Sequence, residues 1–140
     1  MNRHETVATM LGRTSLIIAT LVSPAVNAQI TAKGFATKPM LVAPISGVEG
    51  KEIVLLDVAM DPGASSPRHT HPGDCYGAIL EGTVELVVEG QDPRRFTAGQ
   101  AWHNPRGPVH YFRNVGTSPA RLQNTLVVDQ GKPRTVTQPQ

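Results

Sequence analysis

Short strand-like segments separated by turn residues are the feature that most restricts what this chain can fold into. The stretch CYGAILEGTVELVVEG, residues 75–90, divides after Glu81 into two segments rich in residues that favour β-strands. In the second segment Val84, Leu86 and Val88 alternate with Glu85, Val87 and Glu89, as expected of a strand with one buried face. Strand-sized segments with turn residues about every eight to twelve positions predict an all-β sandwich or barrel.

Segments of the same character cover most of the remaining chain. Twelve prolines and thirteen glycines among 140 residues suit tight turns better than long helices. No stretch after the N-terminal region has a helical period long enough to indicate a helix. Strands are therefore also expected at 52–60, 94–99, 101–104, 109–114 and 120–129.

The charge of the chain is nearly balanced. Thirteen basic and eleven acidic residues give a net charge of +2, so nothing indicates nucleic acid or an anionic membrane as a partner. The expected partners are a small-molecule ligand or substrate and a second copy of the chain. The homodimer is expected because the edge strands of small barrels invite pairing.

The N-terminal region has the pattern of a secretory signal peptide, residues 1–28. Arg3 and Arg13 precede the apolar run TSLIIATLV, which is too short to span a bilayer. Val26 and Ala28 then occupy the −3 and −1 positions of a signal-peptidase site, so cleavage is expected after Ala28. The alternative is an uncleaved membrane anchor. With cleavage, the mature protein is expected in the periplasm or outside the cell, without a membrane segment.

The mature chain is expected to form one domain. Residues 29–50 are a lead that contains the first strand or strands, and residues 51–130 form the barrel. Residues 131–140, GKPRTVTQPQ, are polar and interrupted by proline, which predicts a flexible tail.

Four of the five histidines lie close together in the sequence. His69, His71, His103 and His110 fall within 42 residues. The spacing of His69 and His71 places both side chains on one face of a strand. Because neutral imidazole is a common metal ligand, the pair indicates a metal site, and the alternative is a solvated polar strand end.

Two longer motifs around these histidines resemble the cupin superfamily. In GASSPRHTHPGDCYGAILEG the motif-one positions are Gly63, His69, His71 and Gly82, and in GQAWHNPRGPVHYFRN the motif-two positions are Gly99, Pro105, Gly107, His110 and Asn114. Sixteen residues separate the two motifs. The residues around these motif positions resemble those of small exported single-domain cupins. The resemblance implies an all-β double-stranded β-helix, which is a jelly-roll barrel with a metal inside.

The resemblance also implies the metal ligands. Carried over position by position, the family's histidine ligands are His69, His71 and His110. Where the family has a glutamate ligand, this chain has Cys75; the longer spacing that the motif allows falls on Tyr76, and Asp74 lies one place earlier. The chain therefore departs from the family pattern at its fourth ligand.

The lone cysteine has three interpretations. Cys75 could be the fourth ligand, because a coordinated thiolate is held deprotonated and is partly shielded from oxidation in an exported protein. Such a softer ligand set favours iron, zinc or copper, with manganese and nickel as further alternatives. Otherwise Cys75 is a small buried hydrophobe, or a reactive thiol.

Further residues near the motifs are candidates for a substrate pocket or for contacts to the ligands. Asp74 could accept a ligand N–H or cap its own turn, Tyr76 and Trp102 could pack or form a pocket wall, and His103 could be an extra ligand or a rim residue. Strand parity allows only one of His103 and Asn104 to face the interior. The same holds for two polar residues in a strand otherwise suited to burial, Gln123 and Asn124.

Two functions of different kinds follow from a three-histidine site. With open coordination positions, the protein would be a metal-dependent dioxygenase, or an isomerase or lyase, acting on a small substrate. If Cys75 completes a four-ligand site, the protein would instead be a non-catalytic exported module that binds a metal or a small ligand. A cupin without a metal is a third alternative.

Overall fold

The structure is a computed structural model that describes residues 30–139, and within this range it contains strands and turns without a helix. No helix that could cross a membrane occurs among these residues. The strands are β1 (Phe35–Pro44), β2 (Lys51–Met60), β3 (His69–Thr70), β4 (Asp74–Glu81), β5 (Thr83–Val88), β6 (Arg94–Thr97), β7 (Ala101–Asn104), β8 (His110–Asn114), β9 (Ala120–Asp129) and β10 (Val136–Thr137).

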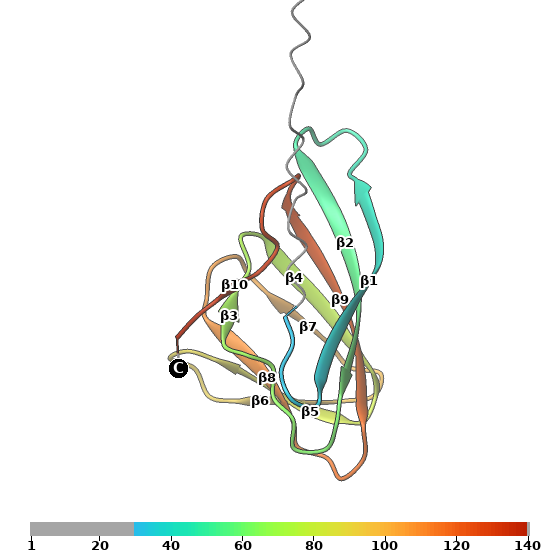
Figure 1. Cartoon of the computed structure of the whole chain (residues 1–140), viewed down its shortest axis with the longest axis vertical. Helices are drawn as coiled ribbons and strands as arrows, with labels where there is room; N and C mark the ends of the chain where they lie inside the picture. Colours follow the sequence, from blue (N-terminus) through green and yellow to red (C-terminus); the bar gives the residue numbers. More distant parts are fainter. Residues whose placement is uncertain (1–29, 140) are drawn as a thin grey trace, which may run out of the picture.

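The strands form two antiparallel five-stranded sheets (Figure 1). The first, called the β9 sheet here, has the order β1-β2-β9-β4-β7, and the second, the β8 sheet, has the order β10-β3-β8-β5-β6. Strands β1, β2 and β9 are the long ones, with ten residues each. The all-β prediction is confirmed.

The strand positions agree with the sequence pattern from β2 to β9. The break after Glu81 separates β4 from β5, and Gly82 at this break has a φ of 85°, a conformation that suits glycine. A Cβ at position 82 would also lie 2.8 Å from the Cβ of Ala120. Gly82 therefore allows the chain to turn from one sheet to the other against the start of β9.

The C-terminal segment differs from the expected flexible tail. Residues 136–137 form β10, in which Val136 pairs with Thr70 and Thr137 pairs with His69. The amide of Gln138 also donates to the carbonyl of Arg68 at 2.8 Å. This segment is therefore part of the β8 sheet, although its two strand residues are exposed. The signal-peptide prediction concerns residues 1–28, which lie outside the described residues.

The core lies between the sheets because alternate residues of each strand point inward. In β9 the buried positions are Ala120, Leu122, Asn124, Leu126 and Val128. Most buried hydrophobic residues form one cluster that includes Phe35, Met60, Ile79, Trp102 and Phe112. A second, smaller cluster contains Val54, Cys75, Leu126 and Val128. Burying each large aliphatic side chain contributes roughly 1.5–3 kcal/mol, so the two clusters hold the sheets together.

Asn114, at the end of the second motif, has a structural role. Its buried side-chain nitrogen lies within hydrogen-bonding distance of three carbonyl oxygens, those of Met60, Asp61 and Ser118, at 2.9–3.2 Å. Its side-chain oxygen accepts from the amide of Gly116 at 2.9 Å. The carboxamide therefore joins the ends of β2 and β8 to the loop before β9.

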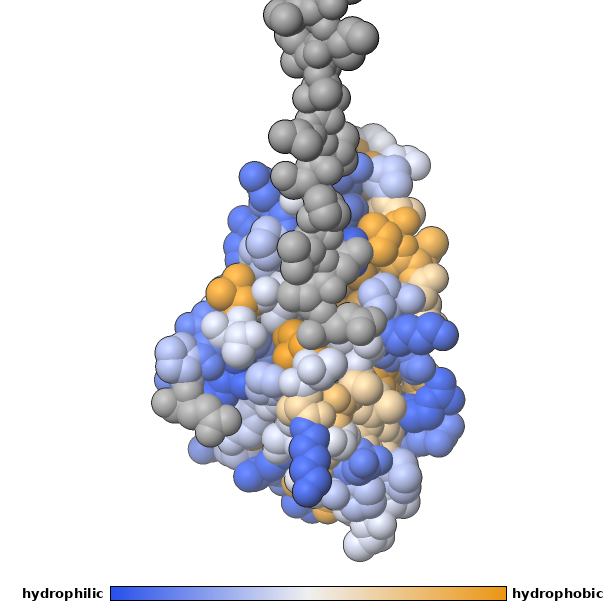
Figure 2. All heavy atoms as spheres, viewed as in Figure 1, coloured by the Kyte–Doolittle hydropathy of each residue, from blue (hydrophilic) through white to orange (hydrophobic). Residues whose placement is uncertain are grey.

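The edge strand β1 carries hydrophobic side chains on its exposed surface. Met40, Leu41 and Val42 are all exposed, and Figure 2 shows hydrophobic atoms over this part of the molecule. The register between β1 and β2 shifts at this point, between Pro39 and Leu41. The homodimer stays a prediction from the sequence.

Candidate metal centre

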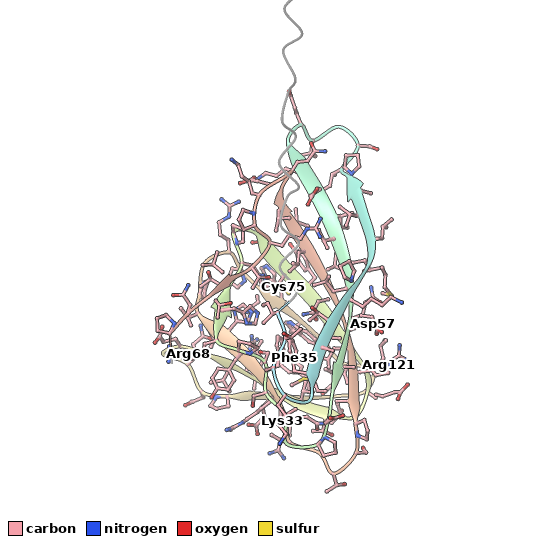
Figure 3. All side chains as sticks on the ribbon, in the orientation of Figure 1. Lys33, Phe35, Asp57, Arg68, Cys75 and Arg121 are labelled. Carbon is pink, nitrogen blue, oxygen red and sulfur yellow. The ribbon has the colours of Figure 1, made fainter. Side chains whose placement is uncertain are left out.

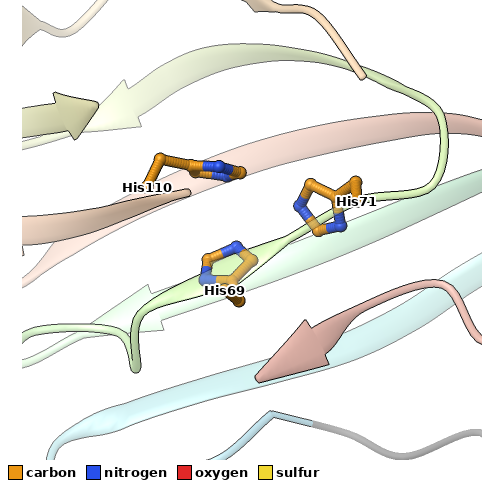
Figure 4. A group of neighbouring side chains, drawn as sticks. All are labelled: His69, His71 and His110. Carbon is orange, nitrogen blue, oxygen red and sulfur yellow. The ribbon is translucent and has the colours of Figure 1, made fainter. Parts of the chain in front are cut away.

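Three of the predicted ligands meet on the inner side of the β8 sheet (Figure 4). His69 of β3 pairs directly with His110 of β8, so the two side chains lie next to each other across the ladder. His71 follows β3, two residues after His69, and therefore returns to the same side. The ring centroids are 4.3 Å apart for His69 and His110, 4.8 Å for His69 and His71, and 5.2 Å for His71 and His110.

The ring nitrogens are close enough to share one ion. Each histidine offers one nitrogen, and these atoms lie within 4.8 Å of one another. All three side chains are buried. The predicted convergence of His69, His71 and His110 on one point is therefore confirmed.

A backbone carbonyl fixes the orientation of each ring. The Nδ1 atoms of His69 and His110 donate to the carbonyls two residues earlier, those of Pro67 at 2.7 Å and Pro108 at 3.0 Å. The Nδ1 of His71 donates to the carbonyl of Arg134, 63 residues away, at 2.8 Å. With the proton held at Nδ1, the lone pair of each ring is on Nε2, the atom that remains for a ligand bond.

Burial keeps the three imidazoles neutral. Desolvation, together with the nearby His110 and His71, lowers the pKa of His69 to about 3. Burial also lowers the pKa of His71 to about 4, and it lowers the pKa of His110. A neutral imidazole is the form that binds a metal, so the rings can act as ligands near neutral pH.

The donor set fits a divalent transition metal. The Nε2 atoms of His71 and His110 are buried and have no hydrogen-bond partner among the described residues. Buried polar atoms are rarely left without a partner, and a metal ion would satisfy both atoms at once. Imidazole donors suit zinc, copper, iron and nickel.

Cys75 does not belong to this group. The set of neighbouring side chains that could hold an ion in residues 30–139 consists of the three histidines alone. Cys75 lies in the interior (Figure 3) and packs with Val54, Leu126 and Val128. This apolar environment raises the pKa of the Cys75 thiol to about 12, which disfavours a thiolate. The structure thus gives no support for a thiolate ligand, and Cys75 occupies the position of a small buried hydrophobe.

Three of the other candidate residues lie on the outer face of the β9 sheet. His103 stacks on Tyr76 with a centroid distance of 4.7 Å, and its Nε2 lies 3.5 Å from an oxygen of Asp74. The hydroxyl of Tyr76 donates to the same carboxylate at 3.3 Å. The backbone N–H of Arg106, at 3.0 Å, is the main reason why the pKa of Asp74 is lowered. Because the strands alternate, this outer cluster of Asp74, Tyr76 and His103 points away from the histidine site, and none of the three lines it.

The remaining candidates divide between the two faces. Trp102 and Asn104 are buried on the inner face of β7. In β9, Gln123 faces outward and its neighbour Asn124 faces inward. The buried positions at Leu122 and Leu126 already set this parity, so the sequence contained the signal that selects Asn124 over Gln123. The contact between His71 and Arg134 had no local signal, because the two residues are distant in the chain.

A family model for the cupin domain matches residues 56–129 of this chain. The chain therefore belongs to the cupin domain family. The match runs from the second half of β2 to the end of β9, the strands that place the histidines and most of the core between the sheets.

Among the relatives by sequence are germin-like proteins of plants. Germin-like protein 3-1 of Oryza sativa subsp. japonica is 29% identical over 114 residues, which is 77% of this chain and 51% of that protein. Germin-like protein subfamily T member 2 of Arabidopsis thaliana is 32% identical over 97 residues, 66% of this chain and 44% of that protein. The chain thus spans about half the length of the germin-like proteins it matches.

Solved structures show the same fold. Oxalate oxidase in complex with the substrate analogue glycolate superposes with a TM-score of 0.62 at 24% identity, over 76% of this chain and 56% of that one. The DMSP lyase DddQ of Ruegeria pomeroyi superposes with a TM-score of 0.60 at 25% identity, over 74% of this chain and 51% of that one. The jelly-roll prediction is confirmed by these likenesses.

Proposed function

We propose that His69, His71 and His110 hold a single divalent transition metal, and that the protein is an exported cupin metalloenzyme that acts on a small molecule. The observation that carries this proposal is the pair of buried Nε2 atoms, on His71 and His110, which have no partner among the described residues. Each ring is held by a carbonyl and kept neutral by burial. Export is proposed from the signal-peptide pattern of residues 1–28.

Three ligands leave room for a substrate. A structural zinc site is usually closed by four protein ligands, whereas a catalytic site keeps a position open. When bound here, a metal such as iron, zinc or copper would polarise a substrate oxygen or, in the case of iron, activate dioxygen. The chain's own contribution is to orient the three rings and to keep their surroundings dry.

Two classes of reaction fit such a site, a dioxygenase and an isomerase or lyase. One protein with this fold is named an oxidase and another a lyase, so the likeness in fold does not choose between the classes. No general base faces the histidine cluster among the candidates, because His103 and Asp74 lie on the outer face. The metal is therefore expected to supply the chemistry.

The alternative is a non-catalytic exported module that binds a metal or a small ligand. That function was expected from a site closed by Cys75 as a fourth ligand. Since Cys75 packs in an apolar cluster outside the ligand group, the open site with three ligands is favoured.

Elemental analysis of the protein purified from the exported fraction, without added metal, tests the proposal. We expect about one equivalent of iron, zinc or copper per chain. A protein that contains no metal, and takes none up from solution, would contradict it. Oxygen uptake by the iron-loaded protein with a panel of phenols, diketones and thiols would then separate the dioxygenase from the other classes.

A further inference from the structure

Three polar atoms on the inner face of the β9 sheet have no hydrogen-bond partner within residues 30–139. Besides the two histidine nitrogens, the buried side-chain atoms without a partner among the described residues are Trp102 Nε1, Asn104 Nδ2 and Asn124 Oδ1. These three side chains are 6%, 2% and 8% exposed, so bulk water does not satisfy them. Such atoms reduce stability, and a folded protein usually has a reason to keep them.

The three side chains are neighbours in the sheet. Gly77 of β4 pairs with Trp102 on one side and with Asn124 on the other. Asn104 pairs with Cys75, the next inward position along β4. Asn104, Trp102 and Asn124 therefore form one strip of inward side chains across three strands, which we call the polar strip.

Gly77 allows this arrangement. A Cβ at Gly77 would lie 2.0 Å from Cζ2 of Trp102 and 2.4 Å from its Cε2, so the indole covers the glycine backbone. Any larger residue at position 77 would displace the indole. The indole N–H, which is bonded to Cε2, is thereby held over β4, between the strands that carry the two asparagines.

The strip lies close to the histidine cluster. The ring of Phe112 contacts both Trp102, at a centroid distance of 5.0 Å, and His110, at 6.1 Å. Asn104 stands beside Cys75, the position where the family carries its fourth ligand. The strip and the histidine cluster thus face the same interior from opposite sheets, with Phe112 in contact with both Trp102 and His110.

Asn114 shows that this fold satisfies an asparagine when the role is structural. Its buried carboxamide uses both its oxygen and its nitrogen, with partners at 2.9–3.2 Å. Asn104 and Asn124 are also buried in the same barrel, yet each has an atom without a partner among the described residues. The difference indicates that their partners come from outside the chain.

We propose that Asn104, Trp102 and Asn124 form the recognition wall of the metal site, and that the wall selects small hydroxy-carbonyl compounds. Asn104 and Trp102 each offer a donor and Asn124 offers an acceptor, so the ligand needs a carboxylate or carbonyl oxygen next to a hydroxyl group. The positive charge near the site is neutralised, because Arg134, whose carbonyl holds His71, pairs with Glu52 at 3.2 Å. A ligand with one negative charge, bound at the metal, suits this environment. This inference rests on the proposed metal site.

Paired probes test the inference. Lactate carries a carboxylate and an adjacent hydroxyl, and propionate is the same molecule without the hydroxyl. Calorimetric titration of both into the protein loaded with one equivalent of cobalt(II) should show lactate bound more tightly. Chelation of the metal by the hydroxyl favours lactate in any case, and a hydrogen bond to Asn124 should add about tenfold to the preference. In Asn124→Leu this preference should fall by about tenfold. In Asn104→Leu both ligands should bind about tenfold more weakly.

Matched controls lie one residue away on the same strands. Gln123→Leu and His103→Leu change outward side chains next to Asn124 and Asn104, and they should leave both affinities unchanged. In the chelator-treated protein, Asn104→Leu and Asn124→Leu should melt at or above the wild-type temperature, because each removes an unpartnered buried atom. A purely structural carboxamide would give a lower melting temperature and unchanged ligand affinity, which would overturn the inference.

Metal stoichiometry is measured first in every variant. A wild-type protein that takes up no metal contradicts the proposed function itself. Normal metal uptake with a preference for lactate over propionate that Asn124→Leu leaves unchanged overturns only the recognition wall.

Discussion

His103 and His110 are close in the sequence but lie in different environments, and the comparison explains much of this protein. His110 is buried on the inner face of the β8 sheet, its Nδ1 held by a carbonyl and its Nε2 without a partner among the described residues. His103 lies on the outer face of β7, exposed, stacked on Tyr76 and beside Asp74. The face of the sheet to which each side chain points therefore separates a proposed metal ligand from a surface residue.

The difference teaches that the surroundings, more than the residue type, assign a role. Burial makes a neutral ring with a free lone pair costly to leave unpaired, so the inner site is suited to an ion. On the outer face the same side chain is solvated, and its exposed contact with Asp74 adds little to stability. Four predictions probe this contrast, from the largest expected effect to the smallest.

Removing an inner histidine should abolish metal binding. In His110→Ala one of three ligands is lost, and we expect metal affinity to fall more than about 100-fold. The matched variant His103→Ala should keep the wild-type affinity. Competition titration with a colorimetric chelator measures both, and equal affinity in the two variants would show that the inner cluster is not the metal site.

The chelator-treated protein should lose stability as the pH falls below about 6.5. Burial lowers the pKa of His69 to about 3 and the pKa of His71 to about 4, whereas the ordinary pKa of a histidine side chain is 6.5. Between these values the unfolded chain binds more protons than the folded one, so the free energy of unfolding decreases as the pH falls. The slope is up to about 1.4 kcal/mol per pH unit for each histidine.

Urea unfolding of the chelated protein at about pH 7, 6 and 5 measures this slope. Replacing one of the groups, as in His71→Gln, should make the slope shallower. A stability that does not change across this range would show that the histidines are not held neutral by the fold.

The C-terminal segment should increase the affinity for the metal, because it holds the ring of His71 in place. Truncation after Pro133 removes the Arg134 carbonyl, and also the hydroxyl of Thr135, which lies 3.3 Å from the same nitrogen. Loss of such contacts typically costs about 10–100-fold in metal affinity. Truncation after Gln138 keeps both contacts and serves as the control. Equal affinities in the two truncated proteins would mean that His71 is oriented by other contacts.

Changing the inner thiol should have the smallest effect on the metal. Cys75→Ala leaves the ligand set intact, so the metal content should stay at the wild-type value, with a loss of about 1 kcal/mol in the free energy of unfolding. Elemental analysis and urea unfolding measure the two quantities. A change in the identity of the bound metal would indicate that Cys75 is a metal ligand after all.

Much of the fold was predictable because strand patterns are local. The alternation in TVELVV and the turn at Gly82 need only neighbouring residues to be recognised. The convergence of His69, His71 and His110 was predicted from the cupin motifs, since strand spacing alone does not bring His110 next to the pair. The choice of Asn124 over Gln123 could also have been made from the parity of Leu122 and Leu126.

The amino-acid sequence thus predicted most of the strands from β2 to β9 and, through the cupin motifs, the three histidines. The closure of the two sheets decided the rest: that Cys75 meets Val54 and Leu126, and that Arg134 holds His71. The physical reason is distance along the chain. Periodicity depends only on neighbouring residues. The contact between His71 and Arg134, 63 positions apart, forms only after β10 near the C-terminus has paired with β3 in the middle of the chain.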